Sequence, residues 1–218
     1  MLTVEIWSDV VCPWCYLGKR RWAAALARFP HAEHVRTVWR SFELRVNQPT
    51  VPGDSLNEMM LRDGHAQDEL DGIFQGIIDL GEKEGIALRP GEYRPVNSFD
   101  AHRLLHVAEG HGLMDALMER VLRAYHSELA NIADPEVLRA LAADSGLPAS
   151  AVSEVLSGDA GAAEVRADET RAAAIKVTSV PSFVIDGRET IHGAVESEAM
   201  LAMLTEEWER HTVAASRA

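Results

Sequence analysis

The chain contains two cysteines, Cys12 and Cys15, and only Pro13 and Trp14 separate them. Two thiols at this spacing can form a disulfide when the second lies one helical turn after the first. In the reduced form of such a pair, the first cysteine can attack a substrate disulfide as a thiolate. The second cysteine can then resolve the mixed disulfide that results. The spacing favours dithiol–disulfide redox chemistry, with Cys12 as an exposed nucleophile and Cys15 as the recessed resolving thiol.

The flanking residues predict that this pair lies between a strand and a helix. Residues 2–8, LTVEIWS, are apolar and β-branched, as in a buried strand. Apolar residues then recur at helical spacing from Pro13 to Phe29, and proline suits the first turn of a helix. Cys12 would meet the unpaired N–H groups and the dipole of that helix, which favour a thiolate. Pro13 keeps the turn tight, and Trp14 offers a flat apolar surface beside the sulfur.

Charged residues near the pair have two interpretations each. Asp9 lies three residues before Cys12 and either relays a proton to Cys15 or forms a turn. The basic run at residues 19–21 adds positive potential or, as we expect, forms a solvated helix face.

A metal site is the main structural alternative for the cysteines. A closed zinc site needs four ligands, and the sequence has no second cysteine pair to complete one. His102, His106 and Glu109 share a helix face by their spacing, but the chain lacks an HExxH motif. We expect a polar helix face or contacts between subdomains there, and no metal. Two inert buried thiols are the remaining alternative.

Composition limits the classes of partner. The 218 residues carry a formal net charge of −13, with 34 acidic and 21 basic side chains, which argues against nucleic acid and anionic membranes. No apolar run approaches the roughly 18 residues of a membrane span. The start, MLTVEIWSDV, lacks a basic segment followed by a long apolar one, so we expect a cytoplasmic protein. A structural disulfide is not expected in a reducing cytosol.

Strand patterns occur at both ends of the chain, and helical patterns fill the middle. Residues 34–44 alternate like a second strand, and residues 181–187 run into an Asp-Gly turn that predicts a hairpin. The intervening residues, 55–176, contain three candidate helix starts, at Ser55, Asn97 and Asp134. A helix is expected at 195–211, with a frayed end. The terminal strands would pair, and the middle would form one helical insertion.

Three motifs carry a family resemblance. CPWC directly after a strand, followed by YLGKRRW, resembles the DsbA-like branch of the thioredoxin superfamily and most closely its FrnE-like subgroup. VTSVPSF at 177–183 is similar to the segment with that superfamily's cis-proline, and NSFDAHRLLHVAEGHG at 97–112 to the subgroup's signature. The likeness covers about residues 1–210. Some relatives have a second cysteine pair, which this chain lacks.

The resemblance implies an α/β, thioredoxin-like fold with a large all-helical insertion. Residues 1–46 and 165–212 would form the thioredoxin-like domain, and residues 47–164 the inserted helical subdomain. The implied activity is that of a thiol–disulfide oxidoreductase that reduces or isomerises disulfides. It would act on a disulfide-containing protein or a small thiol, with no cofactor beyond the Cys12–Cys15 couple, and with glutathione as an open option.

The resemblance also assigns residues to the site. Pro181 would be the cis-proline, and the N–H and C=O of Val180 would pair with an extended substrate, as in strand addition. His102 and Arg103 become candidates for lining the cleft near Cys12.

Two other function classes stay open. Kappa-class glutathione transferases and hydroxychromene-carboxylate isomerases resemble this architecture, but they use one catalytic Ser or Cys to activate glutathione. A non-enzymatic binder or chaperone would need neither thiol, and both are present. The substrate, the redox direction and the oligomeric state are open from the sequence, although a reducing cytosol favours reduction or isomerisation over net oxidation.

Overall fold

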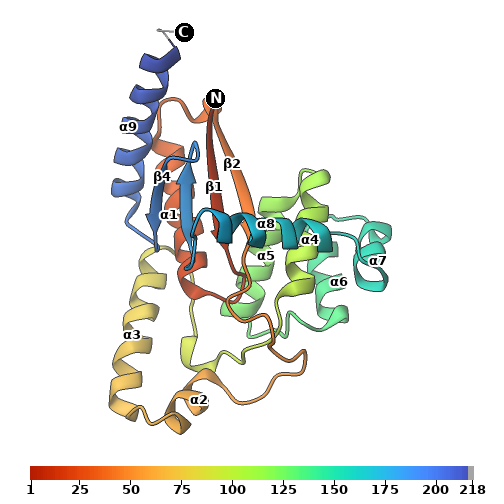
Figure 1. Cartoon of the computed structure of the whole chain (residues 1–218). Helices are drawn as coiled ribbons and strands as arrows, with labels where there is room; N and C mark the ends of the chain where they lie inside the picture. The colour runs from red at the N-terminus through yellow and green to blue at the C-terminus, as the bar shows by residue number, and fades with distance from the viewer. Residues whose placement is uncertain (216–218) are drawn as a thin grey trace.

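The computed structural model describes residues 1–215, apart from the side chains of Glu189 and residues 213–215. Its centre is a four-stranded sheet of order β2-β1-β3-β4 (Figure 1). The strands are β1 (Leu2–Ser8), β2 (Val35–Ser41), β3 (Ser182–Ile185) and β4 (Glu189–His192). Strands β1 and β2 are parallel, and the other two pairs are antiparallel. The two ends of the chain therefore build one sheet, as the strand patterns predict.

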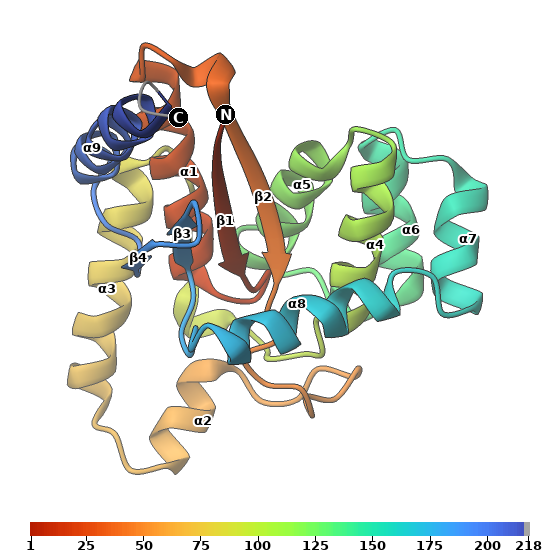
Figure 2. The ribbon, with the colours of Figure 1, turned by 45° about the horizontal axis from the view of Figure 1, so that its top comes forward.

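Helices cover both faces of this sheet and extend beyond one edge. Helix α1 (Pro13–Arg28) connects β1 to β2 and lies on one face with α9 (Ser197–Ala215), whereas α8 (Ala162–Ala174) crosses the opposite face (Figures 1 and 2). The remaining helices lie between β2 and α8 in the chain, and all belong to the insertion between β2 and β3. They are α2 (Leu56–Arg62), α3 (Gln67–Lys83), α4 (Phe99–Gly110), α5 (Met114–His126), α6 (Pro135–Asp144) and α7 (Ala149–Ser157). A short 3-10 turn at Pro90–Glu92 follows α3, and another at Ala32–His34 precedes β2.

Helices α2 to α8 all come from the segment between β2 and β3, so this segment is the helical insertion of the fold. Figure 2 shows two parts to it: α4 to α7 pack together beyond the β2 edge of the sheet, and α2 and α3 form an arm below it. Among residues 1–215, no helix combines the length and the apolarity needed to cross a bilayer.

Local sequence signals explain most of the element boundaries. Ser55 and Glu58 form the capping box expected at the start of α2, and Asp134 caps α6 by accepting a hydrogen bond from the Glu136 N–H. The hairpin turn has Asp186 at φ 47° and Gly187 at φ 68°. Both values lie in the left-handed region that Asp-Gly hairpin turns require.

Three boundaries differ from the sequence-based expectations. The side chain of Asn97 does not cap α4 as a capping box; it bonds the Phe99 N–H, and Asp100 pairs with Arg103 instead. Strand β2 ends at Ser41 because the chain then turns so that the Leu44 N–H reaches Asp9. Helix α9 continues to Ala215, through residues where we expected fraying; residues 216–218 of the expected tail lie outside the described part.

The core fixes the end of β1 against α1. Leu2, Val4 and Ile6 are fully buried in the main apolar core. Trp7 belongs to a smaller apolar cluster that also contains both cysteines. This alternation along one strand places the chemistry at the carboxyl end of β1, between two packed layers.

Candidate active site

The two thiols occupy the first turn of α1. Cys12 is the N-cap residue, with extended backbone (φ −96°, ψ 117°), and Pro13 begins the helix. Cys12 is 5% exposed and Cys15 is fully buried, and both are free thiols. The order of burial is the one the spacing predicts, but Cys12 is not an exposed nucleophile. It is buried and lines a cavity beside the start of α1.

The pair has opposite acid–base properties. The hydrogen bond from the Cys15 thiol lowers the pKa of Cys12 below the ordinary thiol value, with further help from backbone N–H groups. Burial, together with the neighbouring Cys12, raises the pKa of Cys15 well above that value. Cys12 is therefore the thiol of the pair that ionises more readily, and Cys15 holds its proton in the reduced protein.

Asp9 organises the loop between β1 and α1. Its buried carboxylate accepts hydrogen bonds from the N–H groups of Val11 (3.3 Å) and Leu44 (2.7 Å), and it pairs with His102 Nε2 at 3.3 Å. The carboxylate forms no hydrogen bond to either sulfur within residues 1–215, so the turn-forming interpretation fits the geometry. Its negative charge opposes ionisation of Cys12 and raises that pKa.

The loop before β3 faces Cys12. The Val180–Pro181 peptide bond is cis, the geometry that the resemblance implies. The Val180 carbonyl lies 3.9 Å from Cys12 Sγ, which donates to it. Gly18 of α1 makes room for this loop, because a Cβ at that position would lie 2.9 Å from Pro181 Cγ.

A mainly apolar cavity of about 290 Å³ opens beside Cys12. One wall carries Pro13 and Trp14, the second of which is 41% exposed. The opposite wall comes from the insertion, which contributes apolar and tyrosine side chains. They are Leu56, Met60, Ile73, Phe74, Ile77, Tyr93, Pro95, Val96 and Tyr125.

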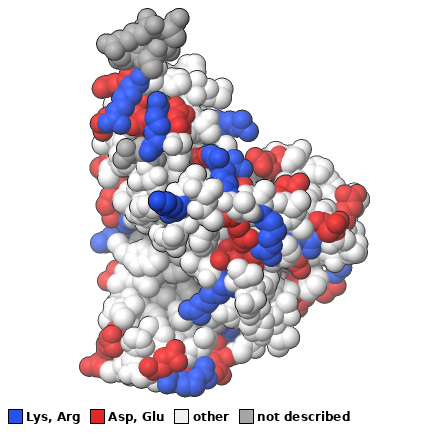
Figure 3. Space-filling view, in the orientation of Figure 1, with Lys and Arg blue, Asp and Glu red and all other residues white. Residues whose placement is uncertain are grey.

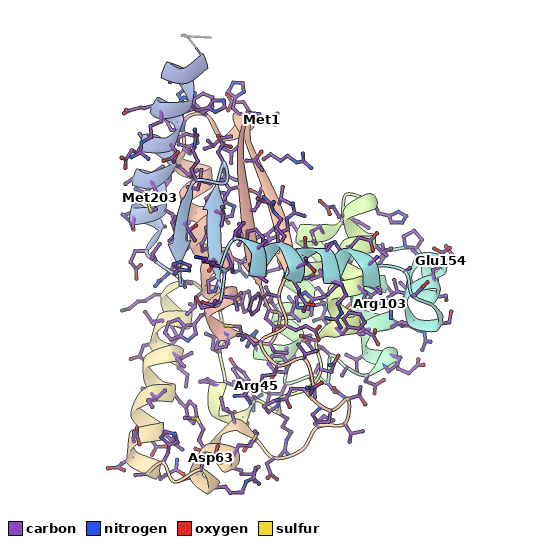
Figure 4. The ribbon with its side chains drawn as sticks, viewed as in Figure 1. Met1, Arg45, Asp63, Arg103, Glu154 and Met203 are labelled. Carbon is purple, nitrogen blue, oxygen red and sulfur yellow. The ribbon has the colours of Figure 1, made fainter. Side chains whose placement is uncertain are left out.

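Arg45 and Gln48 bring polar groups to the mouth of this cavity. Arg45 is exposed on the loop after β2 (Figure 4). Within the described chain, its guanidinium has no hydrogen-bonding or ion-pair partner. An unpaired cation beside an apolar cavity can attract an anionic group of a substrate.

Arg103 does not line the cleft, contrary to our expectation. It is buried and donates to the carbonyls of Val155, Gly158 and Ala160, which ties α4 to the loop before α8. Figure 4 shows it among α4, α7 and α8, far from Arg45. These hydrogen bonds hold its guanidinium at the end of α7 and at the loop before α8, and Arg103 is not among the residues that line the cavity beside Cys12.

His102 does not line the cleft either. Its side chain is 1% exposed, and among residues 1–215 its hydrogen-bond partner at the site is Asp9. His106, one turn further along α4, pairs with Asp168 at 3.0 Å and with Ser41 at 3.1 Å. Among residues 1–215, no three His, Cys, Asp or Glu side chains are grouped as metal ligands would be. The polar face of α4 makes contacts between the insertion and the sheet.

The basic run after the cysteines is not a solvated face. Lys19 is buried and pairs with Asp115 and Glu119 of α5, and Arg21 is buried and pairs with Glu84 and Glu196. These ion pairs fix α1 against the insertion and against the start of α9. On the molecular face in Figure 3, basic and acidic groups are interspersed, and no continuous basic stripe is visible.

The sequence analysis does not predict that residues of the insertion line the cavity beside Cys12. Ile73, Phe74 and Ile77 form an apolar stripe on α3, and this helical spacing was the available signal. Nothing in the spacing of Arg45, Tyr93 and Tyr125 indicates that they lie near Cys12, because long-range packing brings them there.

Comparison with known proteins agrees with this geometry. The family model described as a DSBA-like thioredoxin domain matches residues 3–205. The crystal structure of a probable DsbA oxidoreductase from Streptomyces coelicolor is 37% identical, with a TM-score of 0.89, covering 96% of this chain and 91% of that one. The uncharacterized protein YwbO of Bacillus subtilis is 26% identical over 94% of this chain and 96% of its own length.

A more distant structure shares the fold. The cytosolic disulfide reductase DsbM from Pseudomonas aeruginosa, solved with glutathione, is 17% identical with a TM-score of 0.62, covering 99% of this chain and all of that one. The family match extends over nearly the whole length, and the CxxC pair lies at the helix start where the chemistry requires it. The chain therefore belongs to the DSBA-like thioredoxin domain family, as a DsbA-like thiol–disulfide oxidoreductase whose CxxC pair is Cys12 and Cys15.

Proposed function

We propose that the protein reduces or isomerises disulfides through a mixed disulfide at Cys12. The observation that carries this proposal is the opposite behaviour of two adjacent thiols. Cys12 lines the cavity and has a lowered pKa, whereas Cys15 is enclosed behind it and has a raised one. A nucleophile and a resolving thiol need these two properties.

The reaction has two exchange steps. The Cys12 thiolate attacks one sulfur of the substrate disulfide, and the other substrate sulfur leaves as a thiolate. Cys15 then attacks Cys12 Sγ, which forms the Cys12–Cys15 disulfide and releases the second substrate sulfur; the Cys15 proton ends on the released thiol. The substrate gains two electrons and the enzyme loses two, so an external thiol must reduce the enzyme for another turnover.

The Val180 loop and the cavity together form the proposed substrate site. No described group accepts a hydrogen bond from the Val180 N–H, so an extended substrate can pair with it beside Cys12. Pro13 and Trp14 would contact the substrate on the α1 side. The apolar walls suit aliphatic or aromatic groups next to the substrate sulfur, and Arg45 suits an anionic group.

Replacing Cys15 with Ser tests this mechanism. The variant keeps the attacking thiol and loses the resolving one, so we expect disulfide-reductase turnover with insulin or a small disulfide to fall by at least about a hundredfold, with covalent adducts trapped at Cys12. Non-reducing gels and mass spectrometry detect the adducts. The matched control, Cys12→Ser, should be equally inactive and trap nothing. Undiminished turnover in Cys15→Ser, without adducts, would refute the dithiol mechanism.

A glutathione-dependent isomerase or transferase is the second candidate function. It is favoured by the unpaired Arg45 beside the cavity and by the glutathione bound to the distant structural relative DsbM. Such an enzyme needs only Cys12 to activate the glutathione thiol. Cys15→Ser would then keep most of its rate, so the same variant separates the two functions.

Two finer assignments accompany the proposal. The motifs at 12–22 and 97–112 support membership of the FrnE-like subgroup. The reducing direction fits a cytoplasmic enzyme, because the cytosolic glutathione pool keeps exposed dithiols reduced. Measuring the activity in the cytosolic fraction of the source cells tests the location.

A further inference from the structure

Ser8 has a buried hydroxyl that the fold does not use. It is the last residue of β1 and is 1% exposed. Its backbone takes part in the sheet opposite Ser41, and its carbonyl accepts the Phe42 N–H at 3.2 Å. Its Oγ has no hydrogen-bond partner among the described residues. A buried hydroxyl without a partner costs free energy, so a role outside folding would explain its presence.

The neighbour of this hydroxyl is the resolving thiol. Cys15 Sγ accepts a hydrogen bond from the N–H of Asp9, the residue directly after Ser8, at 3.4 Å. The sulfur therefore lies at the end of β1, beside the Ser8 side chain. The Ser8 hydroxyl is near enough to act on Cys15 without meeting the geometry of a formed hydrogen bond. It and the Asp9 N–H both act to lower the pKa of Cys15, against the effects of burial and of Cys12, which raise it.

The demand on this site changes during the reaction. In the reduced protein, Cys15 is protonated and its thiol bonds the Cys12 sulfur. Once Cys12 is in a mixed disulfide, its negative charge is gone and Cys15 must itself become a thiolate in a fully buried position. A thiolate there needs hydrogen-bond donors. Ser8 Oγ–H is the side-chain donor at hand, and no competing partner holds it.

We propose that the Ser8 hydroxyl donates a hydrogen bond to the Cys15 thiolate as Cys15 attacks the mixed disulfide at Cys12. Ser8 thus acts on the second exchange step and not on the first. The inference rests on the proposed dithiol mechanism. The bond that forms is Cys15 Sγ–Cys12 Sγ, the bond that breaks is Cys12 Sγ–substrate sulfur, and the proton of Cys15 ends on the released thiol.

Stopped-flow reaction of the reduced protein with dithionitrobenzoate separates the two steps. Attack by Cys12 releases one thionitrobenzoate in a phase that depends on reagent concentration. Attack by Cys15 on the resulting adduct releases a second one in a concentration-independent phase. If the parent releases only one equivalent, the dithiol mechanism itself fails, and this outcome is distinct from any effect of Ser8.

Ser8→Ala should leave the first phase within about twofold of the parent and change the second. Loss of the donor moves the pH midpoint of the second phase up by about one unit. A less acidic thiol is also a better intrinsic nucleophile, with a Brønsted slope of about 0.4–0.5. The second phase should therefore be about threefold slower at neutral pH and about threefold faster at pH values above both midpoints.

This crossing of the two pH profiles distinguishes the proposal from a packing effect. A displaced Cys15 would slow the second phase by the same factor at every pH, and that result would overturn the proposal, as would a profile identical to that of the parent. Ser8→Thr retains a hydroxyl and should return the midpoint to that of the parent. Ser41→Ala, which removes a buried hydroxyl at the paired position on β2, is the matched control and should leave the midpoint unchanged. Failure of Ser8→Thr to restore the midpoint that Ser8→Ala displaces would also count against the proposal.

Discussion

At the scale of single residues, His126 shows how a buried group can make stability depend on pH. It is fully buried, and its imidazole packs against the rings of Tyr16, Tyr93 and Tyr125. Its Nε2 donates a hydrogen bond to the Val10 carbonyl at 3.1 Å. Burial lowers the pKa of His126 to about 3. The imidazole, at the end of α5, therefore stays neutral in the folded protein across the physiological range, where it contacts the loop that leads to Cys12.

The lowered pKa predicts an acid-sensitive fold. Below pH 6.5 the unfolded chain binds a proton at this histidine, and the folded chain does not until about pH 3, so stability falls as the pH falls. Between pH 7 and pH 5 this group alone should remove about 2 kcal/mol from the free energy of unfolding. The side-chain amide of His126→Gln can still donate to the Val10 carbonyl but does not bind a proton in this range. In urea titrations, this variant should lack the part of the stability loss between pH 7 and pH 5 that His126 causes.

The exposed His65 provides the control, because its side chain pairs with Glu69 on the surface. His65→Gln should retain the acid sensitivity of the parent to within about 0.5 kcal/mol. Equal pH dependence in the parent and in His126→Gln would show that the imidazole is not kept neutral by the fold.

At the scale of elements, the contact of α1 with the cis-proline loop joins the two halves of the site. Gly18 lies one turn after Cys15, and a Cβ there would approach Pro181 Cγ at 2.9 Å and Phe183 Cζ at 3.4 Å. The helix that carries the thiols therefore packs directly on the loop that faces them. A larger residue must move the loop, the helix or both.

Gly18→Ala should destabilise the protein although alanine favours helices. Overpacking costs about 1–3 kcal/mol, which exceeds the roughly 0.5–1 kcal/mol that alanine contributes over glycine within a helix. Displacement of the loop should also lower kcat/KM for disulfide reduction by about tenfold or more. Denaturant titration and steady-state kinetics measure the two effects.

Gly76→Ala is the matched control for this substitution. Gly76 lies inside α3, and a Cβ there meets no atom within 4 Å, so the change should stabilise the protein by about 0.5–1 kcal/mol. A stability gain for Gly18→Ala of the same size would contradict the tight contact.

The elements were more predictable than the side chains that complete the site. Strand β1, helix α1 and the Asp186–Gly187 hairpin follow from local patterns, because apolar periodicity, Pro13 and the Asp-Gly turn each act on neighbouring residues. Arg103 was misplaced, since its partners are carbonyls more than fifty positions away in the chain. Such contacts depend on how α4 packs on α7 and α8, which single-sequence patterns do not encode.

At the scale of the whole molecule, the sheet and its insertion contribute opposite walls of one cavity. The sheet side supplies Cys12, together with Pro13 and Trp14 at the start of α1, and the insertion supplies residues of α2 and α3 and the two tyrosines, Tyr93 and Tyr125. Ion pairs hold the two parts together, including Arg40 of β2 with Asp168 of α8 and Lys19 of α1 with Glu119 of α5. The insertion thus turns a thiol pair at the end of a sheet into an enclosed site with apolar walls.

Equilibration of the whole protein in glutathione redox buffers tests the central claim most directly, with every species trapped by acid and read by mass spectrometry. A dithiol–disulfide couple predicts one two-electron transition between the reduced protein and a form lighter by two hydrogens. The Cys12–glutathione adduct should remain a minor species, because Cys15 resolves it. An adduct that dominates at equilibrium, without the Cys12–Cys15 disulfide at any buffer ratio, would contradict the account.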